Sequence, residues 1–181
     1  MDKKKVVAIC GSTRQTSINH SLIKAIAALS AANLDLIIFD GIANLPHFNP
    51  DNDGDNVAKE ISDFREQLAN AAGIIICTPE YAHGVPGTLK NAIDWTISSS
   101  SFPKKPTMLI TASTGGKYGH KALMETLKAI EANSVEKLQL VIPFVKTKVN
   151  MDNEITDDKT LAEVERLLAS FIEILSDKQV G

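Results

Sequence analysis

The segment that most clearly indicates the fold is residues 73–95, GIIICTPEYAHGVPGTLKNAIDW. It begins with a short apolar run that contains three consecutive isoleucines, which is typical of a strand buried on both faces. Pro86 and Gly87 then mark the entry to a helix. Apolar residues recur at helical spacing beyond them: Leu89, Ala92, Ile93 and Ile97. A buried strand that leads through a loop into an amphipathic helix is the repeating unit of an open α/β sheet, in which ligands bind beyond the carboxyl ends of the strands.

The size and composition of the chain fit a globular protein with one core. Its 181 residues are 44% hydrophobic and 23% charged, and we predict that residues 1–181 form a single domain. The formal net charge of -3, without a long basic run, argues against a nucleic-acid partner. No apolar run reaches the about 18 residues of a membrane helix, and residues 6–10 are too short for a signal-peptide core. We therefore expect no membrane partner and a cytoplasmic location.

The two cysteines, Cys10 and Cys77, predict neither a disulfide framework nor a metal site. Each lies at the end of an apolar run, where a cysteine usually serves as a small buried hydrophobic residue. We expect both thiols to be buried and no metal ion to be bound.

The rest of the chain repeats the strand–helix pattern. We predict further strands over residues 6–10, 34–39, 107–111 and 138–142, and further helices from residue 18, over 57–71, over 120–132 and after 156–158. The irregular stretch 40–56 keeps Ile42, Leu45 and Phe48 as apolar anchors. Strands that alternate with helices predict an α/β fold: a flavodoxin-like, doubly wound, five-stranded parallel sheet of order 2-1-3-4-5 with helices on both faces.

In this strand order the first, third and fourth strands are neighbours at the switch point of the sheet. The loops that follow them are residues 11–19, 79–87 and 113–119, and they are rich in Gly, Ser, Thr and Pro. We expect these three loops to open onto one ligand-binding crevice.

The first loop, GSTRQTSIN at residues 11–19, has the chemistry of a phosphate site. Gly11 allows close backbone approach, the hydroxyl groups can donate to phosphate oxygens, and the start of a helix adds free N–H groups and positive partial charge. The Arg14 guanidinium can donate charge-assisted hydrogen bonds. The alternative is that Ser17 only caps the helix and Arg14 is solvated. The spacing excludes a G-x-G-x-x-G dinucleotide loop and a G-x-x-x-x-G-K-[ST] loop.

Two motifs resemble those of the NADPH-dependent FMN reductase family. Residues 11–19 are similar to its G-S-x-R-x-x-S-x-N phosphate loop, and residues 79–95 are similar to its P-E-Y-x4-P-G-x-L-K-N-A-[IL]-D-W signature over the whole length. The order of the motifs and the strand–helix pattern also match across nearly the whole chain. The resemblance implies a flavodoxin-like fold, bound FMN, and reduction of flavins, quinones, azo compounds or chromate.

The resemblance also implies which residues bind FMN. The first loop would hold the phosphate and ribityl chain, the second would line the isoalloxazine ring, and the third would close the other edge of the ring. In that order the residues are Ser12, Arg14, Ser17, Ile18 and Asn19; Pro79, Glu80, Tyr81 and Ala82; Ser113, Thr114 and Gly115. The third loop departs from the family pattern, because His120 stands where a second glycine is common. The resemblance therefore does not define the contacts at the edge of the ring. We expect Trp95 in the core or at an interface and His83 to be an ordinary loop histidine.

We predict an oxidoreductase in which NADPH or NADH delivers hydride to FMN and a small-molecule acceptor then takes the electrons. The acceptor would be a quinone, free flavin, azo compound or chromate. The cofactor carries this chemistry, so no side chain is nominated as catalytic. The family implies a homodimer or a homotetramer. Two alternatives are a flavodoxin-type electron carrier that binds FMN without NAD(P)H turnover, and a redox-silent protein of the same fold that binds a phosphate ester.

Overall fold

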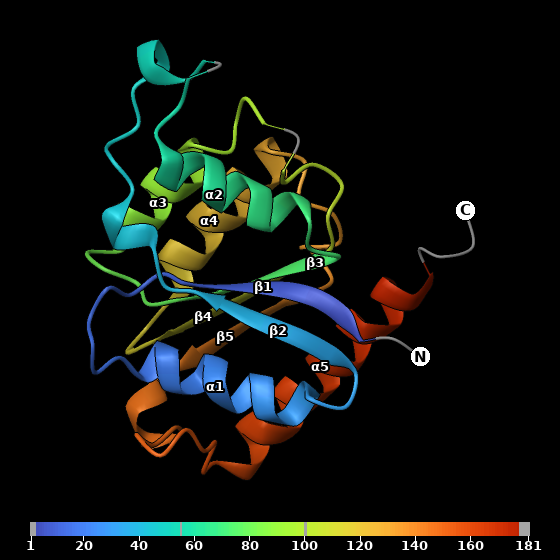
Figure 1. Ribbon diagram of the computed structural model, residues 1–181. Helices are drawn as coiled ribbons and strands as arrows, with labels where there is room; N and C mark the ends of the chain where they lie inside the picture. Colours follow the sequence, from blue (N-terminus) through green and yellow to red (C-terminus); the bar gives the residue numbers. More distant parts are fainter. Residues whose placement is uncertain (1–2, 55, 100, 178–181) are drawn as a thin grey trace.

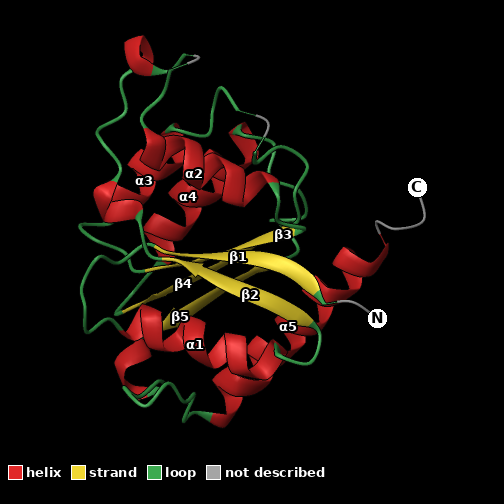
Figure 2. Ribbon diagram, viewed as in Figure 1, coloured by secondary structure: helices red, strands yellow, loops and turns green. Residues whose placement is uncertain are grey.

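A five-stranded parallel sheet forms the centre of the molecule (Figures 1 and 2). The computed structural model describes residues 3–54, 56–99 and 101–177, and its strands lie in the order β2-β1-β3-β4-β5. The strands are β1 Lys4–Cys10, β2 Leu34–Phe39, β3 Gly73–Thr78, β4 Thr107–Ser113 and β5 Gln139–Pro143. Each neighbouring pair is parallel, so the predicted sheet and its strand order are confirmed.

In the described part of the chain, helices cover both faces of the sheet, as predicted (Figure 1). On one face lie α1 Ile18–Ser30 and α5 Asp158–Asp177; on the other lie α2 Lys59–Ala69, α3 Gly87–Asp94 and α4 Lys117–Ala129. Short 3-10 helices are η1 Ile42–Asn44, η2 Pro50–Asn52 and η3 Val145–Thr147. Side chains alternate along a strand, so Ala8 of β1 packs in the core beside α1 and α5, whereas Ile9 packs in the core beside α2, α3 and α4.

The strand predicted from the three isoleucines is β3, and every one of its residues is buried. The helix after it is shorter than the apolar spacing indicated. Because α3 ends at Asp94, Ile97 lies outside the helix and is 59% exposed. Trp95 is buried in the core, as expected, and its indole Nε1–H donates to the Pro46 carbonyl at 2.7 Å.

The helix predicted over residues 120–132 begins earlier, at Lys117, and ends at Ala129. Gly116 adopts the left-handed backbone conformation (φ 111°) before its first turn, and the Glu80 carboxylate accepts hydrogen bonds from Gly116 N–H and Gly119 N–H. The carboxylate comes from another segment, so local sequence patterns do not reveal this start. The loop expected over 113–119 is therefore reduced to residues 114–116, since Ser113 ends β4 and α4 begins at Lys117.

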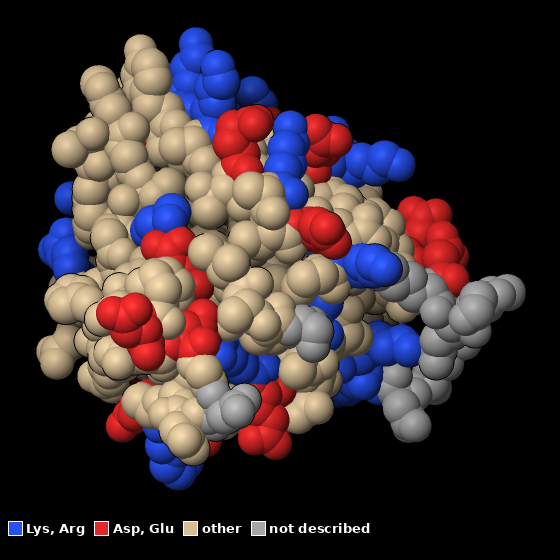
Figure 3. All heavy atoms as spheres, turned by 90° about the horizontal axis from the view of Figure 1, so that it is seen from above, with Lys and Arg blue, Asp and Glu red and all other residues tan. Residues whose placement is uncertain are grey.

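The loop between β2 and α2 projects from the body of the molecule (Figure 1). Its predicted anchors are confirmed: Ile42 and Leu45 are buried, and the Phe48 ring packs edge-on against Trp95 at a centroid distance of 5.0 Å. On the face of the molecule seen in Figure 3, acidic and basic side chains are interspersed, without a large region of one sign. No helix in the described ranges is long and apolar enough to cross a membrane.

Candidate functional site

A cleft of about 500 Å³ opens at the carboxyl edge of the sheet. The segments that follow β1, β3, β4 and β5 line it, and this edge is at the left of Figure 1. The volume falls within the range of about 300–1,000 Å³ that is typical of small-molecule and cofactor sites. The position is the one expected for a ligand at the switch point of an open α/β sheet.

All the predicted FMN-binding residues except Ala82 and Gly115 line this cleft. The structure thus brings together side chains from all three predicted loops. It adds a wall that the sequence analysis missed, formed by Ala112 at the end of β4 and by residues 144–147 after β5. The sequence offered one signal for this wall, which was its position in the chain. A segment that follows the fifth parallel strand reaches the same edge of the sheet as the three predicted loops.

The first loop is shaped by its own hydroxyl groups. The Ser17 Oγ accepts a hydrogen bond from Asn19 N–H at 3.3 Å and caps α1, and the Ser12 Oγ accepts one from Arg14 N–H at 3.4 Å. Ser17 therefore does cap the helix, and it also lines the cleft. The Arg14 side chain lies at the cleft, and no ion pair within the described ranges includes it.

Gly11 is required for contact within the protein rather than for approach to a ligand. A Cβ atom at this position would lie 2.2 Å from the Thr78 Oγ1 and 3.0 Å from a Leu89 methyl carbon. The absent side chain lets the end of β1 pack closely against the end of β3. Gly11 itself does not line the cleft.

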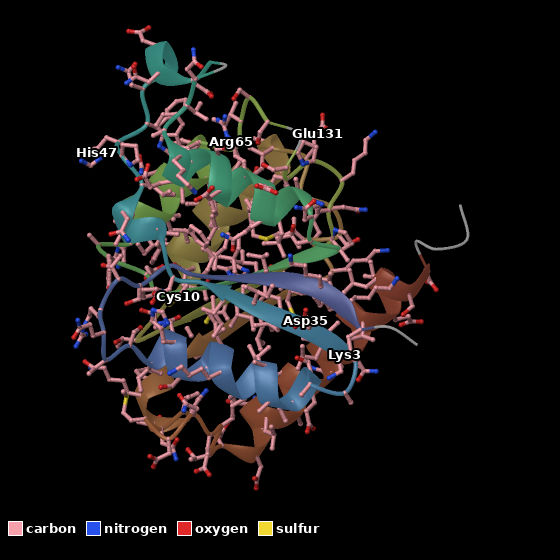
Figure 4. All side chains as sticks on the ribbon, viewed as in Figure 1. Lys3, Cys10, Asp35, His47, Arg65 and Glu131 are labelled. Carbon is pink, nitrogen blue, oxygen red and sulfur yellow. The ribbon has the colours of Figure 1, made fainter. Side chains whose placement is uncertain are left out.

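Asn19 ties the start of α1 to the floor of the cleft. Its Nδ2 donates to the Ala112 carbonyl at 3.1 Å, and its Oδ1 accepts from the Cys77 thiol at 3.3 Å. Both cysteines are buried, as expected, and Figure 4 shows Cys10 near the start of α1. Burial raises the pKa of Cys10 to about 11 and raises the pKa of Cys77 well above its ordinary value. The thiols are protonated at neutral pH, so neither is a nucleophile.

The second loop is bound to α4 through Glu80. The Glu80 carboxylate accepts from Gly116 N–H at 3.2 Å and from Gly119 N–H at 2.5 Å, at the positive end of the helix dipole. Desolvation acts to raise the pKa of Glu80, but the hydrogen bonds from Gly119, Gly116 and Tyr118 outweigh it and lower the pKa. Glu80 is therefore ionised at neutral pH and positions the loop.

The same contact explains the glycine at position 119. A Cβ there would lie 2.8 Å from the Gly84 carbonyl oxygen and 3.1 Å from the Glu80 Cγ. The His83 ring adds a further contact, because it lies 4.5 Å from the Tyr118 ring. The loop after β3 and the first turn of α4 thus form one packed unit beside the cleft.

His120 does not line the cleft. It is 7% exposed, and its ring nitrogens bond to the Thr111 Oγ1 at 2.9 Å and the Gln139 Oε1 at 2.8 Å. The histidine that departs from the family pattern therefore lies among α4, β4 and β5.

The chemistry of the cleft suits FMN. Hydroxyl groups, the start of α1, Arg14 and Lys146 offer donors and positive charge for a phosphate. Pro79, Tyr81 and Phe144 offer apolar and aromatic surface for a flat ring. No group of His, Cys, Asp or Glu side chains suited to hold a metal ion occurs among the described residues.

Residues 4–147 match the sequence model of a family described as NADPH-dependent FMN reductase. The chain belongs to this family. Among the relatives of this chain, a quinone reductase from Escherichia coli (strain K12) is 28% identical over 181 residues, which cover 96% of each chain. An NAD(P)H-dependent FMN reductase from Pseudomonas aeruginosa is 28% identical over 172 residues, which cover 92% of each. Family membership makes the protein an oxidoreductase with FMN as cofactor and NAD(P)H as electron donor.

The fold of this chain also has a solved structural counterpart. The FerB flavoenzyme from Paracoccus denitrificans, an NAD(P)H:(acceptor) oxidoreductase, superimposes with a TM-score of 0.79. The match covers 96% of this chain and 98% of FerB at 24% sequence identity, so it supports the fold.

Proposed function

We propose that this protein reduces quinones. The observation that carries the proposal is the cleft at the switch point, which residues of both family motifs line. These residues offer hydroxyl groups and Arg14 for a phosphate, and aromatic surface for a flat ring. Its relatives include the quinone reductase of Escherichia coli and a 2-hydroxy-1,4-benzoquinone reductase from Burkholderia at 27% identity. A quinone is flat and partly apolar, and therefore complementary to a cleft that exposes Tyr81 and Phe144. Free flavins, azo compounds and chromate are the competing acceptors.

Different residues of the cleft bind different parts of FMN. Arg14, the hydroxyl groups of Ser12 and Ser17, and the start of α1 bind the phosphate. The segment 79–81, with Ser113 and Thr114, flanks the ring, and the Glu80 carboxylate keeps this segment against α4. FMN held in this way would supply the redox chemistry, as a hydride acceptor for NADPH or NADH and an electron donor for the acceptor. No side chain of the cleft has to act as an acid or base in this scheme.

A visible absorption spectrum tests the proposal. The purified protein is mixed with FMN, desalted and then titrated with NADPH without oxygen. We expect a retained flavin band that NADPH bleaches and that benzoquinone restores. Flavin that NADPH fails to bleach would identify an electron carrier, and a protein that retains no flavin would identify a redox-silent binding protein. Restoration by free flavin, azo dye or chromate but not by benzoquinone would refute the quinone assignment.

Arg14→Ala tests the assignment of the phosphate end. Loss of a charge-assisted hydrogen bond, worth about 1.5–3 kcal/mol, should weaken FMN binding about 10- to 100-fold. The matched control is Arg166→Ala, because Arg166 is an exposed residue of α5 outside the cleft. Equal flavin retention by both variants after desalting would contradict the role of Arg14.

We also propose that the protein acts in the cytoplasm as a homodimer or homotetramer. Tyr81, Tyr118 and Phe144 are 49%, 59% and 64% exposed, and Tyr81 and Phe144 line the cleft itself. Exposed aromatic side chains of this size are common at interfaces between subunits. Light scattering on the eluate of a size-exclusion column measures the mass directly, and a mass near 19.6 kDa would exclude an oligomer.

A further inference from the structure

The segment after β5 is built so that it faces the cleft. Phe144 adopts the left-handed backbone conformation (φ 53°), and this turns the chain into η3 directly after Pro143. The Phe144 N–H donates to the Thr114 carbonyl at 3.2 Å, and the Thr147 Oγ1 donates to the Phe144 carbonyl at 2.9 Å. The first bond joins the segment to the loop after β4, and the second closes its turn.

Val145 anchors η3 to the core beside α1. It is buried in the same core as the α1 residue Leu22, and Ile18 at the start of α1 packs against that core. Successive residues of a 3-10 helix are about 120° apart around the axis, so burial of Val145 directs the Lys146 side chain away from the core. Phe144 and Lys146 are exposed, and both line the cleft.

The cleft carries an excess of positive charge. Arg14 and Lys146 line it as cations, and the acidic side chain that lines it is Glu80. The Glu80 carboxylate is already held by the N–H groups of Gly116 and Gly119. Across residues 3–54, 56–99 and 101–177, the ion pairs include neither Arg14 nor Lys146. Both cations therefore face the cleft without an acidic side chain to neutralise them.

We infer that Lys146 is a second cation for the phosphate of FMN, in addition to Arg14. The inference rests on the proposed function, because it requires FMN in this cleft. A phosphate monoester carries a charge of about -1.5 to -2 at pH 7, so one guanidinium leaves part of that charge unbalanced. The ring of FMN and the ribityl chain carry no such charge in the oxidised cofactor. The phosphate is thus the part of FMN that a second cation complements.

The test compares FMN with riboflavin, which has the same ring and ribityl chain but no phosphate. Flavin fluorescence titrations give the Kd of each for the wild type, Lys146→Gln, Lys146→Arg and the control Lys24→Gln. Lys24 is an exposed residue of α1 outside the cleft, so the control removes the same charge. We expect Lys146→Gln to weaken FMN binding about tenfold and to leave riboflavin binding unchanged. Lys146→Arg and Lys24→Gln should bind FMN within about twofold of the wild type.

Salt dependence gives a second readout. Loss of one phosphate contact should make the Kd for FMN rise less steeply with salt in Lys146→Gln than in the wild type. Equal weakening of FMN and riboflavin would overturn the inference, since it would place Lys146 at the ring or ribityl chain. Unchanged FMN binding in Lys146→Gln would overturn it while the proposed function stands. A wild-type protein that binds no FMN would overturn both.

Discussion

At Ala82 and His83 the backbone holds a conformation that residues other than glycine rarely adopt. Their φ angles are 48° and 58°, and the flanking residues close the turn through Tyr81 N–H to Gly84 O and Gly84 N–H to Tyr81 O. A left-handed conformation costs about 1–2 kcal/mol for a residue with a Cβ. The packing of His83 on Tyr118 and the Glu80 carboxylate on α4 offset this cost. The strained turn therefore depends on tertiary contacts beside the cleft.

Ala82→Gly should stabilise the protein. Glycine adopts a positive φ without steric cost, so we expect the free energy of unfolding in urea to rise by about 1 kcal/mol. Ala43→Gly is the control, because Ala43 is an exposed residue of η1 without a positive φ and should lose about 0.5–1 kcal/mol. A loss of stability in both variants would show that the turn at Ala82 is not strained.

Glu80→Gln should destabilise the protein in a pH-dependent way. The carboxylate caps α4, and loss of a cap costs about 1 kcal/mol. The hydrogen bonds hold the pKa of Glu80 in the folded protein below its ordinary value, so the ionised form adds stability above the unfolded pKa. That stability is lost as the pH falls through the lowered folded pKa. In urea unfolding, the free energy of unfolding of the wild type should thus exceed that of Glu80→Gln at pH 7, and the difference should disappear under acidic conditions. A difference that does not change with pH would contradict the role of the charge.

At the scale of elements, the loop after β3 and the helix α4 act as one unit. Their packing depends on Gly119, where the Gly84 carbonyl and Glu80 occupy the space a side chain would need. Glycine inside a helix usually lowers stability, so its presence in the first turn of α4 has a packing reason. The unit carries Glu80 and Tyr81 to the wall of the cleft.

Gly119→Ala should separate the two elements. The new Cβ would meet a backbone oxygen at 2.8 Å, so the loop must move. Overpacking of this kind costs about 1–3 kcal/mol, and we expect a lower thermal midpoint together with weaker FMN binding. Gly87→Ala is the control, since a Cβ at Gly87 has nothing within 4 Å and lies in α3, where alanine favours the helix. Equal midpoints for the two variants would contradict the packing argument.

At the scale of the whole molecule, Arg65 joins the projecting loop before α2 to the body. Figure 4 labels this α2 residue. It donates from its Nε to the Trp95 carbonyl at 2.6 Å and from its guanidinium to the Asp53 carboxylate at 2.7 Å. Ser98 completes the network, because its Oγ donates to the same carboxylate at 2.8 Å. Desolvation raises the pKa of Asp53, but the hydrogen bonds from Arg65 and Ser98 outweigh it and keep the pKa low.

Arg65→Met should loosen this loop and destabilise the fold. It leaves the Asp53 carboxylate, whose side chain is 8% exposed, without its cationic partner. Breaking a buried pair costs about 3–5 kcal/mol, and partial exposure reduces the expected loss here to about 2 kcal/mol. Lys59→Met is the control in the same helix, because its side chain is 82% exposed and water screens its pair with Asp63, so the variant should lose little stability. Urea unfolding and limited proteolysis of residues 46–54 measure both effects, and equal losses would contradict the role of Arg65.

The sheet, its strand order and the convergence of three loops at the switch point could all be predicted from the sequence. These features depend on patterns within contiguous segments, such as the isoleucines of β3 and the Gly, Ser and Pro of the loops. Strand direction and connection rules then leave few arrangements for alternating strands and helices. Most of the residues predicted to bind FMN met at one cleft for this reason.

The way in which those residues are held depends on contacts between distant segments, which the sequence pattern does not reveal. Asn19 bonds to a carbonyl 93 positions away, and Glu80 caps a helix that begins beyond the next strand. The wall that carries Lys146 faces the cleft because Phe144 turns the chain and Val145 anchors it beside α1. Such contacts depend on which side chains meet after the sheet has formed. The spacing of residues within one segment does not predict these meetings between segments.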